Sequence, residues 1–488
     1  MTDCPATTAA ETVSDVPLCV DLDGTLLRSD MLLETLLVLI KSQPYVLILL
    51  PFWLFKGKAN LKSQIANRID FDCSHVPLNE DVLEFVRSER GHRKLYLVTG
   101  TNQELAQGIA DRIGVFDEVM GSTPELNLTN HRKRALLEQR FGKDGFDYIG
   151  NDEDDLNVWP SARKALVVST ADSIAIHSAV EFDRVFETPK TGLRDYLSLL
   201  RVHQWSKNGL LAVPFCLDHR MQDASGALSV ALAFVAMSLL ASATYILNDM
   251  LDLHSDRQNA TKSKRVLASG KMPIMRGVQV IMALVLGFFC ISLLLPPLFN
   301  AVMLIYLITT LTYTFLLKKK AVIDVISLAA LHTLRVIAGT VVIQAAFSFW
   351  LLGFSMFIFF SLACAKRVAE LINLQQAGRE ATVGRDYRVA DIPVMLASGV
   401  STGFISVMVV ALYINSDKVL TLYSNPMILW LLCPLLMYWI GRIWLRTARG
   451  EMHEDPIVFA LRDKVSLLTV LLLGNIVFVA TLFKANLL

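Results

Sequence analysis

The sequence lacks cysteine pairs of the CxxC type, an apolar signal-peptide core in its first residues and an excess of charge of either sign. Its seven cysteines form no CxxC pair and several lie in apolar runs, so we expect neither structural disulfides nor a zinc site. The first residues, MTDCPATTAAETVSDVP, are polar and acidic and contain no apolar signal-peptide core. The formal net charge is +1, so the overall balance identifies no partner, and we expect no nucleic acid among the ligands.

Apolar residues are abundant but unevenly distributed. They make up 53% of the 488 residues, and the mean hydropathy of +0.46 is well above that of an average soluble protein. Residues 1–190 mix charges with short apolar runs, as a soluble α/β domain does, whereas the chain after about residue 205 consists of long apolar stretches between charged loops. The sequence therefore predicts a multidomain protein, with a soluble α/β part followed by an all-α membrane part.

Nine membrane spans are predicted in the second part. A spanning helix needs about 20 mostly apolar residues, and eight stretches approach that length. The ninth, at 196–217, precedes them and is weaker, because Arg201, His203 and Lys207 occupy its start; we expect it to enter the membrane obliquely. The eight longer stretches are 226–248, 277–294, 298–317, 322–345, 347–365, 392–414, 426–446 and 466–485.

Basic residues between the spans predict the orientation. With nine spans, the loops after the second, fourth, sixth and eighth carry nearly all the lysines and arginines, and they fall on the side of the N-terminal domain. Because basic loops stay in the cytoplasm, we expect the N-terminal domain and the active sites on the cytoplasmic face of a bacterial-type inner membrane. The protein would then be multi-pass, with its C-terminus outside.

Four polar residues, Asn248, Asp249, Asp252 and Asp256, follow the second span in the pattern NDxxDxxxD. Spacings of three, four and seven place their oxygens on one face of a helix. Carboxylates at a membrane boundary are costly unless they are paired or bind cations, and Mg²⁺ prefers carboxylates together with substrate phosphate oxygens. The pattern therefore predicts a catalytic Mg²⁺ site formed by the three aspartates, and a solvated acidic loop is the structural alternative.

This motif, together with the later LASG and the nine-span layout, resembles the UbiA superfamily of intramembrane prenyltransferases over roughly residues 195–488. The resemblance implies a helical bundle with a central cavity open to the membrane, whose acidic motifs bind a diphosphate through Mg²⁺. It also implies a polyprenyl lipid and the lipid bilayer as partners.

One departure and a set of further resemblances indicate one branch of that superfamily. Where the typical aromatic prenyltransferase has a second acidic motif, DxxxD, this chain offers Asp324 but Leu328. Upstream, RVHQWSKN (Arg201–Asn208) resembles a motif of the branch that includes decaprenyl-phosphate phosphoribosyltransferases, as do AKRVAEL (Ala365–Leu371) and RGEMHEDPIVFALRDK (Arg449–Lys464). Such enzymes transfer phosphoribose from phosphoribosyl diphosphate to a polyprenyl phosphate.

The resemblance and the charges together define the expected reaction. The acidic motif, with Asp324, would hold Mg²⁺ on the diphosphate while a polyprenyl phosphate oxygen attacks the sugar. Such an acceptor needs cations more than a strong general base, although each basic residue taken singly has an ordinary positive-inside role as its alternative. The alternative reaction moves a polyprenyl chain from its diphosphate to an aromatic acceptor. The residues expected to bind substrate are Lys207, Asn248, Lys262, Arg265, Tyr313, Lys318, Asp324, Arg335, Lys366 and Arg367.

The N-terminal part carries a second set of motifs. PLCVDLDGTLLRSD, an apolar run that ends in DxDGT, resembles the first motif of the haloacid dehalogenase superfamily. A buried strand would deliver Asp21 to the carboxyl end of a sheet, as the nucleophile that forms an aspartyl-phosphate, with Asp23 as acid and base. Thr99 in KLYLVTG and Lys133 in NHRKRALLEQRFG match the next two motifs. The resemblance implies a Rossmann-like α/β phosphatase domain with a helical cap.

The fourth motif departs from that family. It usually opens with Gly-Asp but here reads Gly150-Asn151, and the neutral Asn151 is a poorer Mg²⁺ ligand. Asp155 or Asp152 would carry the charge instead, and we place Asp155 at the metal with Asp21 and Asp23. An active domain would remove the 5-phosphate from the lipid-linked product, whereas a scaffold or regulatory domain with lost chemistry is the alternative.

These motifs also define the domain boundaries. We predict a phosphatase-like domain at 1–180 with a cap at about 28–90, a linker at 181–195 and a transferase domain at 196–488. The cap contains PYVLILLPFWLF (Pro44–Phe55), which is too short to span a membrane. With lysines on both sides, this segment would either lie in the headgroup region of the membrane or form a buried cap helix.

Overall fold

The computed structural model describes residues 16–124, 126–169, 180–218, 222–259, 261–382, 385–452 and 455–482. Its contacts divide the chain into two compact units. The N-terminal unit comprises the described part of Met1–Leu200 together with Tyr245–Ile281, and the membrane unit comprises the described part of Arg201–Thr244 and Met282–Leu488. The sequence places the acidic motif in the transferase domain. By its contacts, however, the motif belongs to the N-terminal unit.

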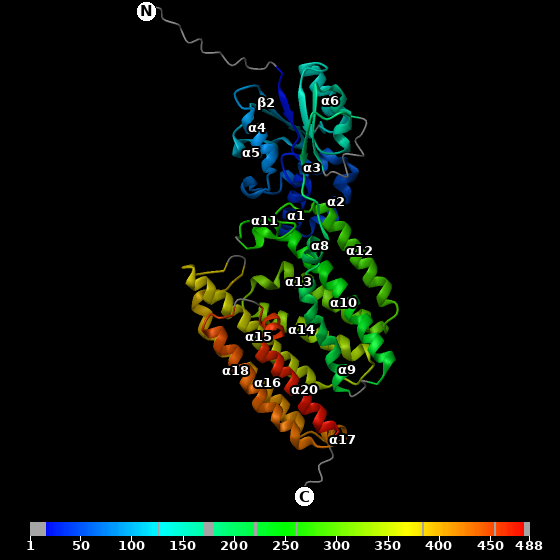
Figure 1. The fold of residues 1–488 in the computed structure, drawn as a ribbon, viewed down its shortest axis with the longest axis vertical. Helices are drawn as coiled ribbons and strands as arrows, with labels where there is room; N and C mark the ends of the chain where they lie inside the picture. The colour runs from blue at the N-terminus through cyan, green and yellow to red at the C-terminus, as the bar shows by residue number, and fades with distance from the viewer. Residues whose placement is uncertain are drawn as a thin grey trace, which may run out of the picture. The chain divides into compact units, whose positions relative to one another are not determined.

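A six-stranded parallel sheet forms the core of the N-terminal unit (Figure 1). The strand order is β3-β2-β1-β4-β5-β6, so β1 lies between β2 and β4, where the order reverses. Strand β6 lies within the segment predicted as a linker, and its Arg184 pairs with Leu166 of β5. The strands are β1 (Leu18–Val20), β2 (Leu95–Asn102), β3 (Glu118–Ser122), β4 (Asp147–Gly150), β5 (Lys164–Ser169) and β6 (Arg184–Glu187).

Apolar side chains that alternate along the strands form a buried core on each face of this sheet. Leu18 and Val20 contribute to one apolar core, together with residues of α5 (Gln103–Ile113). Cys19, between them, belongs to the core on the other face with residues of α6 (Asn130–Phe141). Successive side chains of a strand alternate between faces, and crossover helices cover a parallel sheet on both sides. The predicted α/β architecture of this part is therefore confirmed, and its sheet is parallel.

Between β1 and β2 the chain forms a helical insertion, where the sequence predicts a cap. Its first three helices enclose a small apolar core of their own, whereas α4 packs against the sheet. The outer side chains of α2 are strongly exposed, with Ile48 at 72% and Phe55 at 95%, which favours a surface position over a buried cap helix. The four helices are α1 (Met31–Ser42), α2 (Val46–Phe55), α3 (Lys58–Ala66) and α4 (Glu80–Ser88).

Eight helices among the described residues are long and apolar enough to cross a membrane (Figure 1). They correspond to the eight longer predicted stretches and make this a multi-pass membrane protein. The weaker stretch at 196–217 is not one long helix but part of α8 (Leu193–Leu199), a 3-10 segment (Val202–Ala212) and α9 (Val213–Leu217), so the ninth span stays a prediction. The eight helices are α10 (Ala224–Leu251), α12 (Ile274–Ser292), α13 (Pro297–Phe315), α14 (Ile323–Val342), α15 (Phe349–Gln376), α16 (Ile392–Ile414), α18 (Leu432–Ala448) and α20 (Lys464–Leu482).

Helix α15 continues beyond the predicted end of its span. The sequence places Lys366 and Arg367 in a loop after residue 365, but both lie on the helix, which runs to Gln376. The apolar residues Val368 and Leu371 follow these charges and are buried in the bundle, so packing maintains the helix. The prediction was wrong here because a drop in hydropathy marks the end of an apolar stretch and not the end of a helix.

Three helices of the membrane unit approach closely at Gly399 of α16. A Cβ added there would lie 2.7 Å from the Cβ of Cys364 in α15 and 2.2 Å from the ring of Trp444 in α18. Ser361 of α15 donates a hydrogen bond to the carbonyl oxygen of Gly399 at 2.6 Å and accepts one from Trp444 Nε1 at 3.1 Å. Small residues allow helices to approach in membranes, and this contact fixes the helix that carries two of the predicted substrate-binding cations.

Candidate functional site

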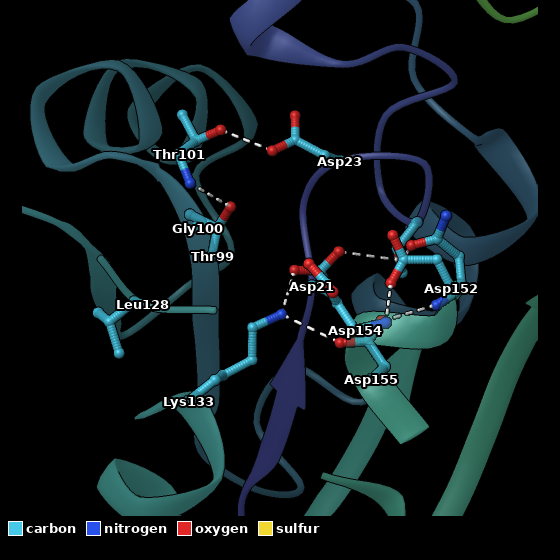
Figure 2. Close-up of polar contacts among 12 residues, drawn as sticks. Asp21, Asp23, Thr99, Gly100, Thr101, Leu128, Lys133, Asp152, Asp154 and Asp155 are labelled. Atoms are coloured by element: carbon cyan, nitrogen blue, oxygen red, sulfur yellow. Dashed lines mark hydrogen bonds and ion pairs between the residues drawn. The ribbon is translucent and has the colours of Figure 1, made fainter. Parts of the chain in front are cut away.

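The carboxyl ends of three adjacent strands meet in the N-terminal unit. Asp21 directly follows β1 and Asp155 follows β4, while Thr99 lies within β2, two residues beyond the partner of Val20. Where strand order reverses, crossover helices leave on opposite faces and open a crevice in which α/β proteins bind ligands. Figure 2 shows Asp21, Asp23, Thr99, Lys133 and Asp155 gathered at this edge of the sheet.

Lys133 of α6 joins two of these carboxylates. Its Nζ donates to Asp21 Oδ1 at 2.7 Å and to Asp155 Oδ1 at 3.1 Å (Figure 2). Tyr148 of β4 also accepts from this Nζ at 2.9 Å and donates to Asp155 at 2.6 Å. Burial raises the pKa of the Asp21 carboxyl to about 8, and the charge of Lys133 opposes this shift. Burial lowers the pKa of Lys133, but attraction to Asp155 and Asp21 outweighs it and raises that pKa, so the lysine stays charged and orients Asp21.

Asp23 is held through both oxygens of its carboxyl group. Thr101 Oγ1 donates to Asp23 Oδ2 at 2.6 Å, and the backbone N–H of Met31 donates to Oδ1 at 2.8 Å. Burial raises the pKa of Asp23 to about 6, and the negative charge of Asp30 adds to the rise. A carboxyl that titrates near neutral pH suits acid–base catalysis. The sequence predicts Thr99, which is buried and accepts from the Thr101 N–H, but not Thr101; the period of two along a strand would have identified it.

Gly150 and Asn151 shape the fourth motif. A Cβ on Gly150 would lie 2.4 Å from Asp155 Oδ2, so glycine is what allows this carboxylate to approach the end of β4. The backbone N–H of Asn151 donates to the same oxygen at 2.9 Å. Asp155 is buried and bound to Lys133, whereas Asp152 is exposed. Of the two carboxylates left open as replacements for the usual aspartate, Asp155 is therefore the one that the structure places in the cluster.

The second group of carboxylates lies at the end of α10 and in α11 (Leu253–Arg257). Arg265 Nη1 donates to Asp249 Oδ1 at 2.8 Å and to Asp256 Oδ2 at 2.5 Å, so one guanidinium joins two carboxylates of the predicted motif. Lys262 Nζ lies 3.8 Å from Asp256 Oδ1. Both cations were predicted to bind substrate, and the structure brings them to the acidic motif.

The other two residues of the motif have different neighbours. Asp252 pairs with Lys41 of α1, with 2.7 Å between Lys41 Nζ and Asp252 Oδ1. Asn248 is half-buried, and its backbone carbonyl accepts the N–H of Asp252 at 2.9 Å. Within the ranges that the structure describes, no group of three His, Cys, Asp or Glu side chains is arranged to hold a metal ion.

In the membrane unit, Asp324 is fully buried and is neutralised by Arg367 of α15. Arg367 donates to Asp324 from Nε and, at 3.1 Å, from Nη2, and the hydroxyl of Tyr313 donates to Asp324 Oδ1 at 2.8 Å. Arg367 also pairs with Glu370, which accepts from Arg385 at 2.9 Å. The structure thus brings three predicted substrate-binding residues together, in a cluster where two arginines face two carboxylates.

Replacing Arg367 by methionine is expected to destabilise the membrane unit. The substitution would leave Asp324 as a buried carboxylate without its arginine, at a cost of about 3–5 kcal/mol. The thermal midpoint of the detergent-purified protein should fall by roughly 10 °C. Arg449→Met, which removes an exposed arginine, is the matched control. An unchanged midpoint in Arg367→Met would show that the pair is not structural.

In a second basic cluster of the membrane unit, the positive side chains outnumber the carboxylates that neutralise them. Lys207 and Lys366 donate to the same oxygen, Asp455 Oδ2, each at 2.9 Å. Arg335 of α14 is buried, and its Nε donates to Asn208 Oδ1 at 3.0 Å. In the part of the chain that the structure describes, the ion pairs of Lys207 and Lys366 involve one carboxylate, that of Asp455, and the hydrogen-bond partners of Arg335 are neutral groups. We call these three cations and Asp455 the Lys207 cluster, and it carries an excess of positive charge.

Two residues in or near the Lys207 cluster, Asp455 and His332, are not among the predicted site residues. Asp455 lies in the segment Arg449–Lys464, for which the sequence offers a resemblance but no role. His332 lies one turn before Arg335 on α14, and its buried Nδ1 has no hydrogen-bond partner among the described residues. Lys318, which was predicted to bind substrate, is half-buried in the 3-10 turn between α13 and α14.

The relatives of this chain cover between 40% and 92% of its length. The uncharacterized protein y4nM of Sinorhizobium fredii is 37% identical over 457 residues, which are 92% of this chain and 88% of that protein. The nodulation protein NoeC of Azorhizobium caulinodans is 32% identical over 277 residues, covering 57% of this chain and 90% of that protein. Decaprenyl-phosphate phosphoribosyltransferase of Mycobacterium tuberculosis is 32% identical over 200 residues, covering 40% of this chain and 66% of that enzyme.

A solved structure and a family model also match this chain. A UbiA homolog from Archaeoglobus fulgidus, solved with GPP and Mg²⁺, aligns with a TM-score of 0.44 at 15% identity, covering 58% of this chain and 99% of that one. The model of the UbiA prenyltransferase family matches residues 216–478, which is more than half of the chain. The protein therefore belongs to the UbiA prenyltransferase family.

Proposed function

We propose that this protein transfers phosphoribose from phosphoribosyl diphosphate to a polyprenyl phosphate, in a reaction that requires Mg²⁺. Within the family, the similarity to decaprenyl-phosphate phosphoribosyltransferase over 200 residues supports this choice. The structural observation that carries it is the excess positive charge of the Lys207 cluster, which suits an acceptor that is itself a phosphate.

The acidic motif suits a divalent cation. Asp249 and Asp256 both contact the same cationic group of Arg265, so their carboxylates lie close enough to share one ion. Carboxylates and substrate phosphate oxygens are the ligands that Mg²⁺ prefers. Asp249, Asp252 and Asp256 would hold the ion, which when bound would stabilise the charge of the departing diphosphate.

The Lys207 cluster would hold the acceptor. Lys207 and Lys366 share the single carboxylate of Asp455, and Arg335 donates to neutral groups, so a phosphate monoester would complete the charge balance. A phosphate oxygen would also offer a partner to the buried Nδ1 of His332. An acceptor that is already ionised must be oriented more than deprotonated. The arginines around Asp324 are less suited to this role because carboxylates already neutralise them.

In the proposed reaction an oxygen of the acceptor phosphate attacks the anomeric carbon of the sugar. The bond from that carbon to the diphosphate breaks, and diphosphate leaves with the bonding electrons. Negative charge develops on the leaving group, so a preorganised cation at the acidic motif, such as Arg265, lowers the barrier. The product is a polyprenyl-phosphoryl 5-phosphoribose.

We infer further that the N-terminal unit is a phosphatase of the haloacid dehalogenase type that removes the 5-phosphate from this product. Asp21, oriented by Lys133, would attack the phosphorus and form an aspartyl-phosphate. Asp23, held by Thr101, would protonate the departing sugar oxygen and then activate the water that releases inorganic phosphate. Asp21, Asp23 and Asp155 would hold Mg²⁺, whose charge would offset that of the phosphate.

A transfer assay tests the proposed transferase activity. Detergent-purified full-length protein is given Mg²⁺, phosphoribosyl diphosphate labelled in the ribose, and a polyprenyl phosphate. Label that enters the lipid phase only when polyprenyl phosphate is present would support phosphoribosyl transfer. Absence of that transfer, together with prenylation of an aromatic acid from a polyprenyl diphosphate, would overturn it in favour of the alternative reaction.

Replacing Lys207 by methionine is expected to raise the KM for polyprenyl phosphate by about 10- to 100-fold, because a charge-assisted hydrogen bond contributes about 1.5–3 kcal/mol. The KM for phosphoribosyl diphosphate should change by less than about threefold, since that substrate would bind at the acidic motif. Steady-state kinetics with each substrate varied in turn gives both constants. Lys319→Met removes an exposed lysine and is the control. An equal rise in both constants would contradict the assignment of Lys207 to the acceptor.

A further inference from the structure

One helix of the N-terminal unit connects the phosphatase-like site to the acidic motif. Helix α1 begins beside the first site, where the backbone N–H of Met31 donates to Asp23 Oδ1 at 2.8 Å. At its other end, Lys41 Nζ lies 2.7 Å from Asp252 Oδ1. The helix has 12 residues and is therefore about 18 Å long. A residue of the phosphatase-like domain thus reaches a predicted metal ligand of the transferase.

A buried ion pair fixes α1 between these two ends. Glu34 of α1 is 2% exposed and accepts two hydrogen bonds from Arg257 of α11, at 3.0 and 2.5 Å. Arg257 Nε also donates to the carbonyl oxygen of Ala268, in the LASG segment. Bidentate pairs between arginine and carboxylate have a specific geometry, so α1 cannot turn without breaking this pair. Figure 1 shows α11 beside α1, as these contacts require.

The loop that follows the acidic motif is seated on the same domain at a second place. Gly270 has a φ of +71°, and a Cβ there would lie 2.8 Å from the Cβ of Arg28 and 3.1 Å from Pro77. Lys271 pairs with Asp195 at 2.7 Å. Backbone conformation and close approach both require glycine at this position, so the contact depends on the backbone as well as on flexible side chains.

From these contacts we propose that Lys41 is a positioning residue of the transferase site. Without substrate, its ammonium group is an internal counter-ion of Asp252. When the metal and the diphosphate bind, the ammonium group of Lys41 moves from Asp252 to a phosphate oxygen. Its side chain is 34% exposed and can make this movement, whereas Arg257 is buried and cannot. This role rests on the proposed function for the identity of the diphosphate.

Lys41 in this role has opposite effects on metal and on substrate. A cation beside Asp252 competes with a divalent ion for the carboxylate, while the same cation attracts a diphosphate. Removing the charge should therefore tighten metal binding in the absence of substrate and weaken the binding of the diphosphate. A purely structural role would instead weaken both, because the motif would lose its geometry.

The substitution Lys41→Met in the full-length protein distinguishes the positioning role from a purely structural role. Mn²⁺ is the probe for the divalent site, and its binding without substrate is measured by electron paramagnetic resonance. We expect the Kd for Mn²⁺ to fall by about twofold to fivefold, as expected for a partly exposed ion pair. The KM for phosphoribosyl diphosphate should rise about 10- to 100-fold, with kcat within about threefold of wild type. Lys41→Arg keeps the charge and should restore both constants.

Two further proteins complete the experiment. Asp249→Asn identifies which bound Mn²⁺ belongs to the acidic motif, and Lys56→Met, which removes an exposed lysine after α2, should behave as wild type. Weaker Mn²⁺ binding by Lys41→Met, or an unchanged KM, would overturn the role of Lys41. If the wild-type protein transfers no phosphoribose, the proposed function fails, but the Mn²⁺ comparison still decides whether Lys41 competes with metal at Asp252.

Discussion

Replacing Asp249 by asparagine is expected to lower the transfer of phosphoribose to the lipid by about a thousandfold or more. The substitution keeps the shape of the side chain and removes the charge that, together with Asp256, faces Arg265 and would face Mg²⁺. Stabilisation of a leaving group by a metal contributes several kcal/mol, and about 4 kcal/mol corresponds to a thousandfold change in rate. The initial rate at which labelled ribose enters the lipid phase, measured with both substrates at saturation, gives the effect.

The control for this variant is Glu451→Gln, which neutralises an exposed carboxylate outside the acidic motif and should retain wild-type transfer. Asp249→Asn should also keep the thermal midpoint of the wild type, because Arg265 retains Asp256 as its partner. A fully folded Asp249→Asn protein that transfers phosphoribose within about tenfold of the wild-type rate would exclude a metal-binding role for Asp249.

The membrane-spanning helices could be predicted from the sequence because the bilayer imposes a simple requirement. A helix in lipid must satisfy its own backbone hydrogen bonds and needs a long apolar run, and the eight longer apolar stretches all correspond to such helices. The predicted helix ends were less accurate where charged residues lie within the helix bundle. Helix α15 continues from residue 365 to Gln376, because the side chains after its first charges are buried in the bundle.

The sequence analysis treated two adjacent cations as one group, and the structure separates them. Lys366 and Arg367 are adjacent, and no sequence pattern assigns them to different sites. Adjacent residues of a helix do not face each other, and the structure places Lys366 with Asp455 and Arg367 with Asp324. Lys366 therefore joins the cluster with excess positive charge, whereas Arg367 is neutralised. The different partners of Lys366 and Arg367 follow from their positions on the helix and from how the helix packs.

The pairs that define the sites could not be found from local patterns. Periodicity along a strand or helix reports neighbours within one element, so it placed Asp21 at the end of a strand. Lys207 and Asp455 are 248 residues apart, and no spacing rule connects them. Lys41 and Asp252 likewise meet only because the loop after α10 packs on the N-terminal domain. Such ion pairs depend on how the elements pack against one another. The residue pattern within a single element does not predict that packing.

Replacing Asp21 by asparagine is expected to lower the release of inorganic phosphate by about 10⁴-fold or more and to make the phosphorylated lipid product accumulate. The amide cannot form the aspartyl-phosphate, and removal of a covalent nucleophile commonly has effects of this size. Asparagine retains the shape of the side chain and can still accept a hydrogen bond from Lys133. The full-length protein is supplied with phosphoribosyl diphosphate and polyprenyl phosphate, and the lipid products and released phosphate are measured over time.

Asp154→Asn is the matched control, because it neutralises an exposed aspartate of the fourth motif and should release phosphate as wild type does. Transfer of phosphoribose should continue in Asp21→Asn, since the transferase chemistry does not involve Asp21. Equal release of phosphate by wild type and Asp21→Asn would exclude Asp21 as the nucleophile. A wild-type protein that makes the phosphorylated lipid but releases no phosphate would identify the N-terminal domain as a scaffold, and its contacts from Glu34 and Lys41 to the acidic loop would then be its contribution to the transferase.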